Sequence, residues 1–303
     1  MTALDMPIGG VANPRGDIRT SSLSGVRKIR NGIATGFMVG SLMLALIPLV
    51  LVILIVVSKG AGALSWDFLT VEIPRQFRSD GPGMGPAVAG TIVITLAASL
   101  MAIPLGILGA IYLNEYGRQK RLARIIRTMS DVMTGVPSIV MGLFIFVAFV
   151  LKTGDKSGFA AALALGCLML PIVIRSTEEV LRLVPQELRM ASLALGARRW
   201  RTTLTVVLPA AFSGITSGAM LAVARAAGET APVVVTAGIT FRTNWALTGE
   251  QTTLAAQIFR NASQPFPGAQ ERAWGAAITL ILMVFVLTLI ARFVASRFST
   301  SDR

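Results

Sequence analysis

Apolar stretches, each nearly free of charge, recur along the chain and are separated by shorter polar segments. A helix needs about 20 consecutive apolar residues to cross the hydrocarbon core of a bilayer. Six stretches approach or exceed this length: residues 33–57, 87–113, 132–151, 159–174, 206–239 and 273–294. The fourth is short and the fifth is too long for one crossing, so we expect both to deviate from simple straight spans.

None of the six stretches shows the period-two alternation of a membrane β-strand, and only helices and closed barrels satisfy the backbone within lipid. The pattern predicts an all-α integral membrane protein with six transmembrane helices. The first stretch is about twice as long as the apolar part of a signal peptide, so we expect an uncleaved anchor. The predicted organisation is a cytoplasmic tail (1–32), the first transmembrane helix with an extracytoplasmic loop (33–83), a five-helix core (84–294) and a cytoplasmic C-terminal tail (295–303).

The composition agrees with a membrane location, whereas the net positive charge is also typical of a soluble protein that binds nucleic acid. Apolar residues make up 53% of the chain, charged residues only 14%, and the mean hydropathy is +0.70. An ordinary globular protein carries about 25% charged residues. The 28 Lys and Arg exceed the 15 Asp and Glu by 13, which on a soluble protein would suggest nucleic acid as a partner.

The placement of the basic residues gives this charge a different meaning. Of the 28 Lys and Arg, 19 fall on one side of the predicted membrane, 8 on the other, and Arg225 lies within the fifth stretch. Cytoplasmic loops of membrane proteins carry an excess of Lys and Arg. We therefore expect a multi-pass protein of the cytoplasmic membrane with both termini in the cytoplasm, in contact with lipid and not with nucleic acid.

The sequence offers little support for catalysis. It contains no His and a single Cys, Cys167, and no cluster of metal-ligating residues, so we expect no metal site. The Gly-rich segment 81–85 lacks the Lys of a phosphate-binding P-loop. We expect no cofactor and no enzyme activity in this chain, which leaves transport, channel, receptor or assembly functions.

Two charges within the fifth stretch are candidates for a functional site. Arg225 and Glu229 are four residues apart, which places them on one face of a helix. Arg225 lies about 24 Å along that helix beyond Pro209, and burying either charge alone would cost about 2.5 to 3.5 kcal/mol on insertion scales. The pair either pins helix packing or belongs to an anion path in which Glu229 holds Arg225 and competes for it. Arginine suits the second role because its planar group of donors matches an oxyanion.

Further charges lie at the ends of the third and fourth stretches. Arg175, with Glu178 and Glu179 nearby, either continues an anion path or is an ordinary cytoplasmic anchor. Asp131 is expected to be an interfacial residue at the start of a helix.

The cytoplasmic loop at about 178–205 predicts a short helix. It begins at Pro185, ends at Gly196, and places Leu188, Ala191 and Leu195 on one face. Such a helix either lies on the membrane surface or docks a cytoplasmic partner.

The residues that follow this helix carry a resemblance. Gly196, nine further residues and then Val206-Val207-Leu208-Pro209 resemble the E-A-A-x3-G-x9-I-x-L-P loop of binding-protein-dependent ABC importer permeases. In that family the loop sits in a groove on the ATPase subunit, which implies a coupling role for Glu187, Ala191, Leu195, Gly196 and Pro209. The chain departs from the pattern with Met190-Ala191-Ser192 in place of Glu-Ala-Ala and Val206 in place of Ile, and Glu187, one turn earlier, is a possible substitute for the missing Glu.

Four further motifs narrow the resemblance, which runs from about Met84 to Arg292. The segments 114–116, 135–142, 170–178 and 225–232 look like those of the A-type permease of the high-affinity phosphate importer. The resemblance implies a type I ABC importer permease fold, with Arg225, Glu229, Arg175 and Glu178 as candidates for the phosphate pathway.

The same resemblance implies the partners of the chain. They are a C-type sister permease, two ATPase subunits that bind ATP and Mg²⁺, and an extracytoplasmic phosphate-binding protein. A permease for another oxyanion, such as sulfate or molybdate, remains an alternative. So does a structural or signalling membrane subunit without its own pathway.

Overall fold

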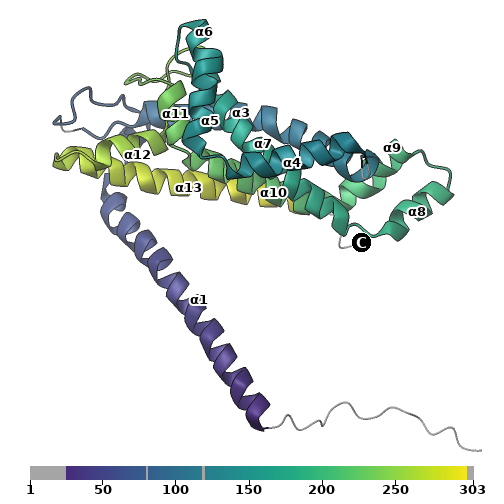
Figure 1. Ribbon diagram of the computed structural model, residues 1–303. Coiled ribbons are helices and arrows are strands. Elements are labelled where there is room, and N and C mark those ends of the chain that lie inside the picture. The colour runs from purple at the N-terminus through teal and green to yellow at the C-terminus, as the bar shows by residue number, and fades with distance from the viewer. Residues whose placement is uncertain (1–24, 80, 118–119, 299–303) are drawn as a thin grey trace, which may run out of the picture. The chain divides into compact units, whose positions relative to one another are not determined.

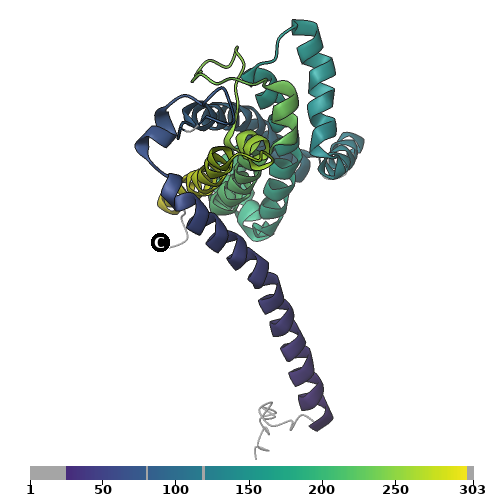
Figure 2. The ribbon, with the colours of Figure 1, turned by 90° about the vertical axis from the view of Figure 1, so that its left-hand side faces the viewer.

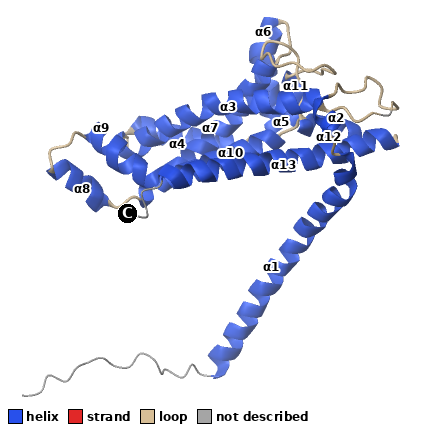
Figure 3. Cartoon of the chain, turned by 180° about the vertical axis from the view of Figure 1, so that it is seen from behind, coloured by secondary structure: helices blue, strands red, loops and turns tan. Residues whose placement is uncertain are grey.

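The computed structural model describes residues 25–79, 81–117 and 120–298, and every regular element within these ranges is helical (Figure 1, Figure 3). The all-α prediction is therefore confirmed. Most of the predicted N-terminal tail (1–24) and of the predicted C-terminal tail (299–303) lie outside the described residues.

Five helices are long and apolar enough to cross a membrane, and a sixth crossing results if one bent helix pair counts as a span. The long helices are α1 (Gly25–Gly60), α3 (Gly85–Ile111), α7 (Gly158–Leu183), α10 (Leu208–Gly228) and α13 (Pro267–Phe298). The shorter ones are α2 (Trp66–Thr70), α4 (Arg121–Gly135), α5 (Ser138–Ile145), α6 (Leu151–Thr153), α8 (Gln186–Ala194), α9 (Arg199–Thr202), α11 (Ala231–Thr236) and α12 (Leu254–Ala262). A 3-10 turn, η2 (Ala61–Ala63), and three π-helical turns, η3 (Tyr112–Tyr116), η4 (Phe146–Val150) and η5 (Thr203–Val207), complete the helical elements.

The third predicted span, 132–151, is wrong as one straight helix. The chain bends by 107° between α4 and the continuous helical segment Ser138–Thr153. Pro137 explains the break, because proline lacks a backbone N–H and forces the residue before it out of the helical conformation. Val136 accordingly has extended backbone angles (φ −70°, ψ 128°).

The fourth and fifth predicted spans have opposite outcomes. The fourth does not deviate, because α7 is one helix that continues beyond Arg175 to Leu183. The predicted stretch ended before its first charged residue, Arg175, whereas the helix continues through charged residues. The fifth deviates as expected: α10 ends at Gly228, and α11 begins at Ala231 with Pro232 in its first turn.

The chain divides into two compact units, Met1–Leu54 and Ile55–Arg303. In the second unit α3, α7, α10 and α11 share one buried core, and Figure 2 shows the packed helices nearly end-on. Seven of the thirteen buried residues of this core are alanine, in keeping with the small residues that let membrane helices approach closely. α5 packs against α11 so closely that a Cβ on Gly142 would lie 2.6 Å from the Cα of Pro232.

Candidate functional site

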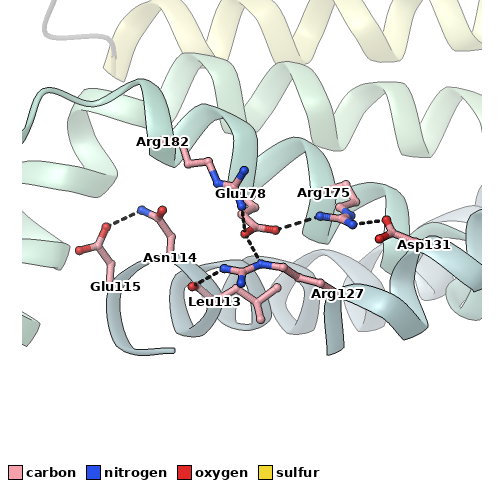
Figure 4. Close-up of polar contacts among 8 residues, drawn as sticks. All are labelled: Leu113, Asn114, Glu115, Arg127, Asp131, Arg175, Glu178 and Arg182. Atoms are coloured by element: carbon pink, nitrogen blue, oxygen red, sulfur yellow. Dashed lines mark hydrogen bonds and ion pairs between the residues drawn. The ribbon is translucent and has the colours of Figure 1, made fainter. Parts of the chain in front are cut away.

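A carboxylate surrounded by three arginines lies on α7 (Figure 4). The side chain of Glu178 is 1% exposed and accepts hydrogen bonds from Arg182 Nη2 at 2.6 Å and Arg127 Nε at 2.7 Å. Arg175 Nη1 lies 3.4 Å from its other oxygen. We call Arg127, Asp131, Arg175, Glu178 and Arg182 the Glu178 cluster.

Two helices build this cluster. Arg175, Glu178 and Arg182 share one face of α7 at spacings of three and four residues, and Arg127 and Asp131 lie four apart on the neighbouring α4. Asp131 forms an ion pair with Arg175. The prediction that Asp131 begins a helix is therefore wrong, because α4 starts ten residues earlier at Arg121 and Asp131 lies near its end.

The charges of the cluster do not cancel. Three guanidinium groups face two carboxylates, which leaves one net positive charge. Guanidinium donors suit tetrahedral oxyanions as well as carboxylates. Glu178 occupies donors that an incoming anion would use, so the cluster has the chemistry of an anion site with an internal competitor.

Arg225 and Glu229 also form an ion pair, although not with the predicted geometry. Arg225 Nε and Glu229 Oε1 are 3.7 Å apart, and the two side chains are 64% and 18% exposed. The expectation that both lie on one helix face is wrong, because α10 ends at Gly228 and Glu229 is extended (φ −70°, ψ 129°). The contact is made across the helix end and is looser than a hydrogen bond.

The two ion-pair groups lie at different depths of the bundle. A Cβ on Gly218 would lie 2.5 Å from Ser176 Oγ, so this part of α10 contacts α7 next to Arg175. Arg225 is seven residues further along α10, about 10 Å at the rise of an α-helix. The structure thus places the predicted pathway residues in two clusters at successive levels.

The predicted loop helix is α8, which lies with α9 beyond one end of the packed helices (Figure 1). Leu188, Ala191 and Leu195 are exposed, Leu195 to 89%. Gly196 ends the helix with a φ of +82°, a conformation that favours glycine. Ser192 Oγ and Thr202 Oγ1, 2.9 Å apart, join α8 to α9.

The other two predicted coupling residues are also on the surface. Glu187 is exposed in the first turn of α8 and, among the residues that the structure describes, forms no ion pair. Pro209 is exposed in the first turn of α10. The coupling role of these residues stays a prediction.

Sequence reasoning missed four residues of these sites. Arg127 and Arg182 belong to the Glu178 cluster, and Arg189 of α8 pairs with Glu115 at 3.0 Å. The spacing of Glu178 and Arg182 could have indicated their contact. The partners Arg127 and Glu178 are 51 residues apart, and Glu115 and Arg189 are 74 apart, so no local pattern reports them. In the described part of the chain, no group of three or more His, Cys, Asp or Glu could hold a metal ion.

Membrane-crossing helices, arginine–carboxylate ion pairs that include the buried Glu178, and an exposed amphipathic helix are together typical of a membrane transport component. Residues 102–300 match the family model described as "Binding-protein-dependent transport system inner membrane component". The chain belongs to this family. It is a multi-pass membrane protein and a transport component, not an enzyme.

Individual relatives cover nearly the whole chain. It is 42% identical to the phosphate transport system permease protein PstA 1 of Mycobacterium tuberculosis (strain CDC 1551 / Oshkosh), over 97% of each chain. It is 37% identical to the phosphate transport system permease protein PstA of Yersinia pestis, over 89% of this chain and 92% of that one.

Solved structures confirm the fold. A chain of the inward-facing MetNI methionine ABC transporter aligns with a TM-score of 0.56 at 19% identity, over 71% of this chain and 93% of that one. A chain of a bacterial ABC transporter involved in the import of the acidic polysaccharide alginate aligns with a TM-score of 0.57 at 14% identity, over 89% of this chain and 99% of that one. The chain has the fold of a type I ABC importer permease.

Proposed function

We propose that this chain is a permease subunit that passes inorganic phosphate across the cytoplasmic membrane by alternating access, energised by a separate ATPase. The relatives named as phosphate transport permeases support the substrate, since one of them is 42% identical along 97% of the chain. The observation that carries the proposal is the presence of arginine and carboxylate clusters at two successive depths of the bundle.

These clusters suit a path for a dehydrated anion. Phosphate carries one to two negative charges near neutral pH, and fixed arginine charges offset part of the cost of removing its water. Arg225 lies on an exposed stripe of α10 that also carries Leu221, Ser217 and Ser213, which precede it by four, eight and twelve residues. A charged side chain in a membrane faces a wet cavity or a partner rather than lipid. Glu178 and Glu229 weaken the arginines' hold on the anion, so that it is not trapped.

The function requires further subunits. We propose a C-type sister permease, two ATPase subunits that bind ATP and Mg²⁺, and an extracytoplasmic phosphate-binding protein. In this arrangement α8 docks on an ATPase subunit through its exposed apolar face, since a contiguous exposed apolar surface marks an interaction site. The end of the bundle that carries α8, and both chain termini, are then cytoplasmic, in keeping with the excess of basic residues on that side.

Phosphate uptake in cells that produce Arg225→Gln at normal membrane levels tests the proposal. We expect uptake to fall about tenfold or more, because a charged donor to the anion is lost. Uptake at the wild-type rate would contradict the role of Arg225 in the anion pathway. Competition by sulfate or molybdate would indicate another oxyanion, and full uptake after exchange of Arg225 and Glu229 for one another would indicate a packing clamp.

A further inference from the structure

The π-helical turn η3 at the end of α3 lies between the docking helix α8 and the Glu178 cluster. On one side, Glu115 Oε1 accepts hydrogen bonds from Arg189 Nη2 at 3.0 Å and Nε at 3.3 Å. Asn114 Nδ2 donates to the same oxygen at 2.7 Å. Because the side chain of Arg189 is 7% exposed and that of Glu115 14% exposed, water competes little for this pair.

The guanidinium of Arg189 joins three elements at once. Besides Glu115 of η3, it donates to the carbonyl oxygens of Val184 at 2.6 Å and Leu181 at 2.8 Å. Carbonyls in the last turn of a helix lack an intrahelical donor, and Arg189 supplies one at the end of α7. A displacement of α8 therefore either carries η3 and the end of α7 with it or breaks buried, charge-assisted bonds.

On its other side the same turn contacts the Glu178 cluster. Arg127 Nη2 donates to the carbonyl oxygen of Leu113 at 2.9 Å while its Nε donates to Glu178 at 2.7 Å. Leu113 is fully buried, and only Asn114 separates it from Glu115. An unbroken series of bonds thus runs from Arg189 through Glu115, the backbone of η3 and Arg127 to Glu178.

We propose that η3 is the link through which movement of α8 reaches the Glu178 cluster, with Glu115 and Arg189 as its positioning residues. The inference rests on the proposed function, in which α8 docks an ATPase and Glu178 lies on the anion path. When α8 shifts and moves η3, the bond to the carbonyl of Leu113 moves Arg127 relative to Glu178. This changes the number of arginine donors that are free to bind an anion. The ATPase cycle is thereby coupled to the affinity of the Glu178 cluster for the anion.

The test is the number of phosphate ions imported per ATP hydrolysed by the complete complex in liposomes. Glu115→Gln and Arg127→Gln are each expected to lower this ratio about tenfold while the ATPase subunits still co-purify. Their double variant is expected to fall no further than the lower single variant, because both changes break the same link. Arg124→Gln, an exposed arginine on the same helix as Arg127, is the control and is expected to keep the ratio.

Two results would overturn the link: a wild-type ratio in Glu115→Gln, or a double variant whose loss is the product of the single losses. If Glu115→Gln does not accumulate in the membrane, Arg189→Gln takes its place in the same measurement, with the same two outcomes. Glu115→Asp keeps the carboxylate and is expected to restore most of the ratio. A wild-type complex that imports no phosphate would contradict the proposed function itself, whereas normal wild-type import with an unchanged ratio in Glu115→Gln contradicts only the link.

Discussion

Replacing Glu178 by Gln removes one negative charge from the Glu178 cluster while nearly preserving the size of the side chain. Glutamine keeps a single acceptor oxygen, so the short contacts to Arg127 (2.7 Å) and Arg182 (2.6 Å) lose their charge assistance. Three guanidinium groups then face Asp131 alone. We expect the variant to be less stable because like charges are left together around a buried, neutral amide.

The magnitude follows from these two contacts. A hydrogen bond to a charged group contributes about 1.5 to 3 kcal/mol. Arg127 and Arg182 are 23% and 55% exposed, so water replaces part of the loss and the lower value applies to each. The third contact, at 3.4 Å, adds little. The free energy of unfolding should therefore fall by about 3 kcal/mol.

The assay is unfolding of the purified protein in mild detergent as the fraction of a denaturing detergent is raised. Glu179→Gln is the matched control, because Glu179 is the next residue and is exposed. Its unfolding free energy should stay within about 0.5 kcal/mol of the wild type. Equal stability of the two variants would show that the carboxylate of Glu178 does not hold the arginines, and would refute the reasoning.

Two backbone positions give further predictions. Gly196→Val forces a branched side chain into a left-handed conformation, with φ at +82°, at a cost of roughly 1 to 2 kcal/mol. Co-purification of the ATPase and phosphate uptake should both fall. Unchanged values of both would contradict the proposal that α8 docks on the ATPase. Gly142→Ala places a methyl group 2.6 Å from the Cα of Pro232 and should lower the unfolding free energy by about 1 to 3 kcal/mol. Gly135→Ala meets no atom within 4 Å and serves as its control.

Much of the fold could be predicted because lipid imposes a simple rule on composition. Apolar stretches of sufficient length indicated where helices lie, and the excess length of the fifth stretch indicated that it is not one straight span. The same count failed at two points for physical reasons. It passed over Pro137, which bends the third span, and it ended the fourth span at Ile174, before Arg175, although α7 continues through charged residues three and four apart.

The candidate site was predictable only where its residues are close in sequence. Arg175 with Glu178 and Arg225 with Glu229 were found as local pairs, and both pairs are in contact. Arg127 and Arg189 were missed, since each meets its carboxylate only after the helices pack. The local spacing of residues does not report the packing that brings α4 to α7 or α8 to the end of α3.

The alanine-rich core has a consequence for motion. Large interlocking side chains hold two helices in one register, because sliding them past each other opens cavities that cost about 24 cal/mol per Å³. The shared core of α3, α7, α10 and α11 presents shallow surfaces instead, with alanines such as Ala98, Ala161 and Ala222 at its contacts. Small shear movements between such helices leave little empty volume behind. Larger apolar residues at these contacts would strain the close packing and would also oppose the sliding of the helices, so the protein would alternate more slowly between its two sides.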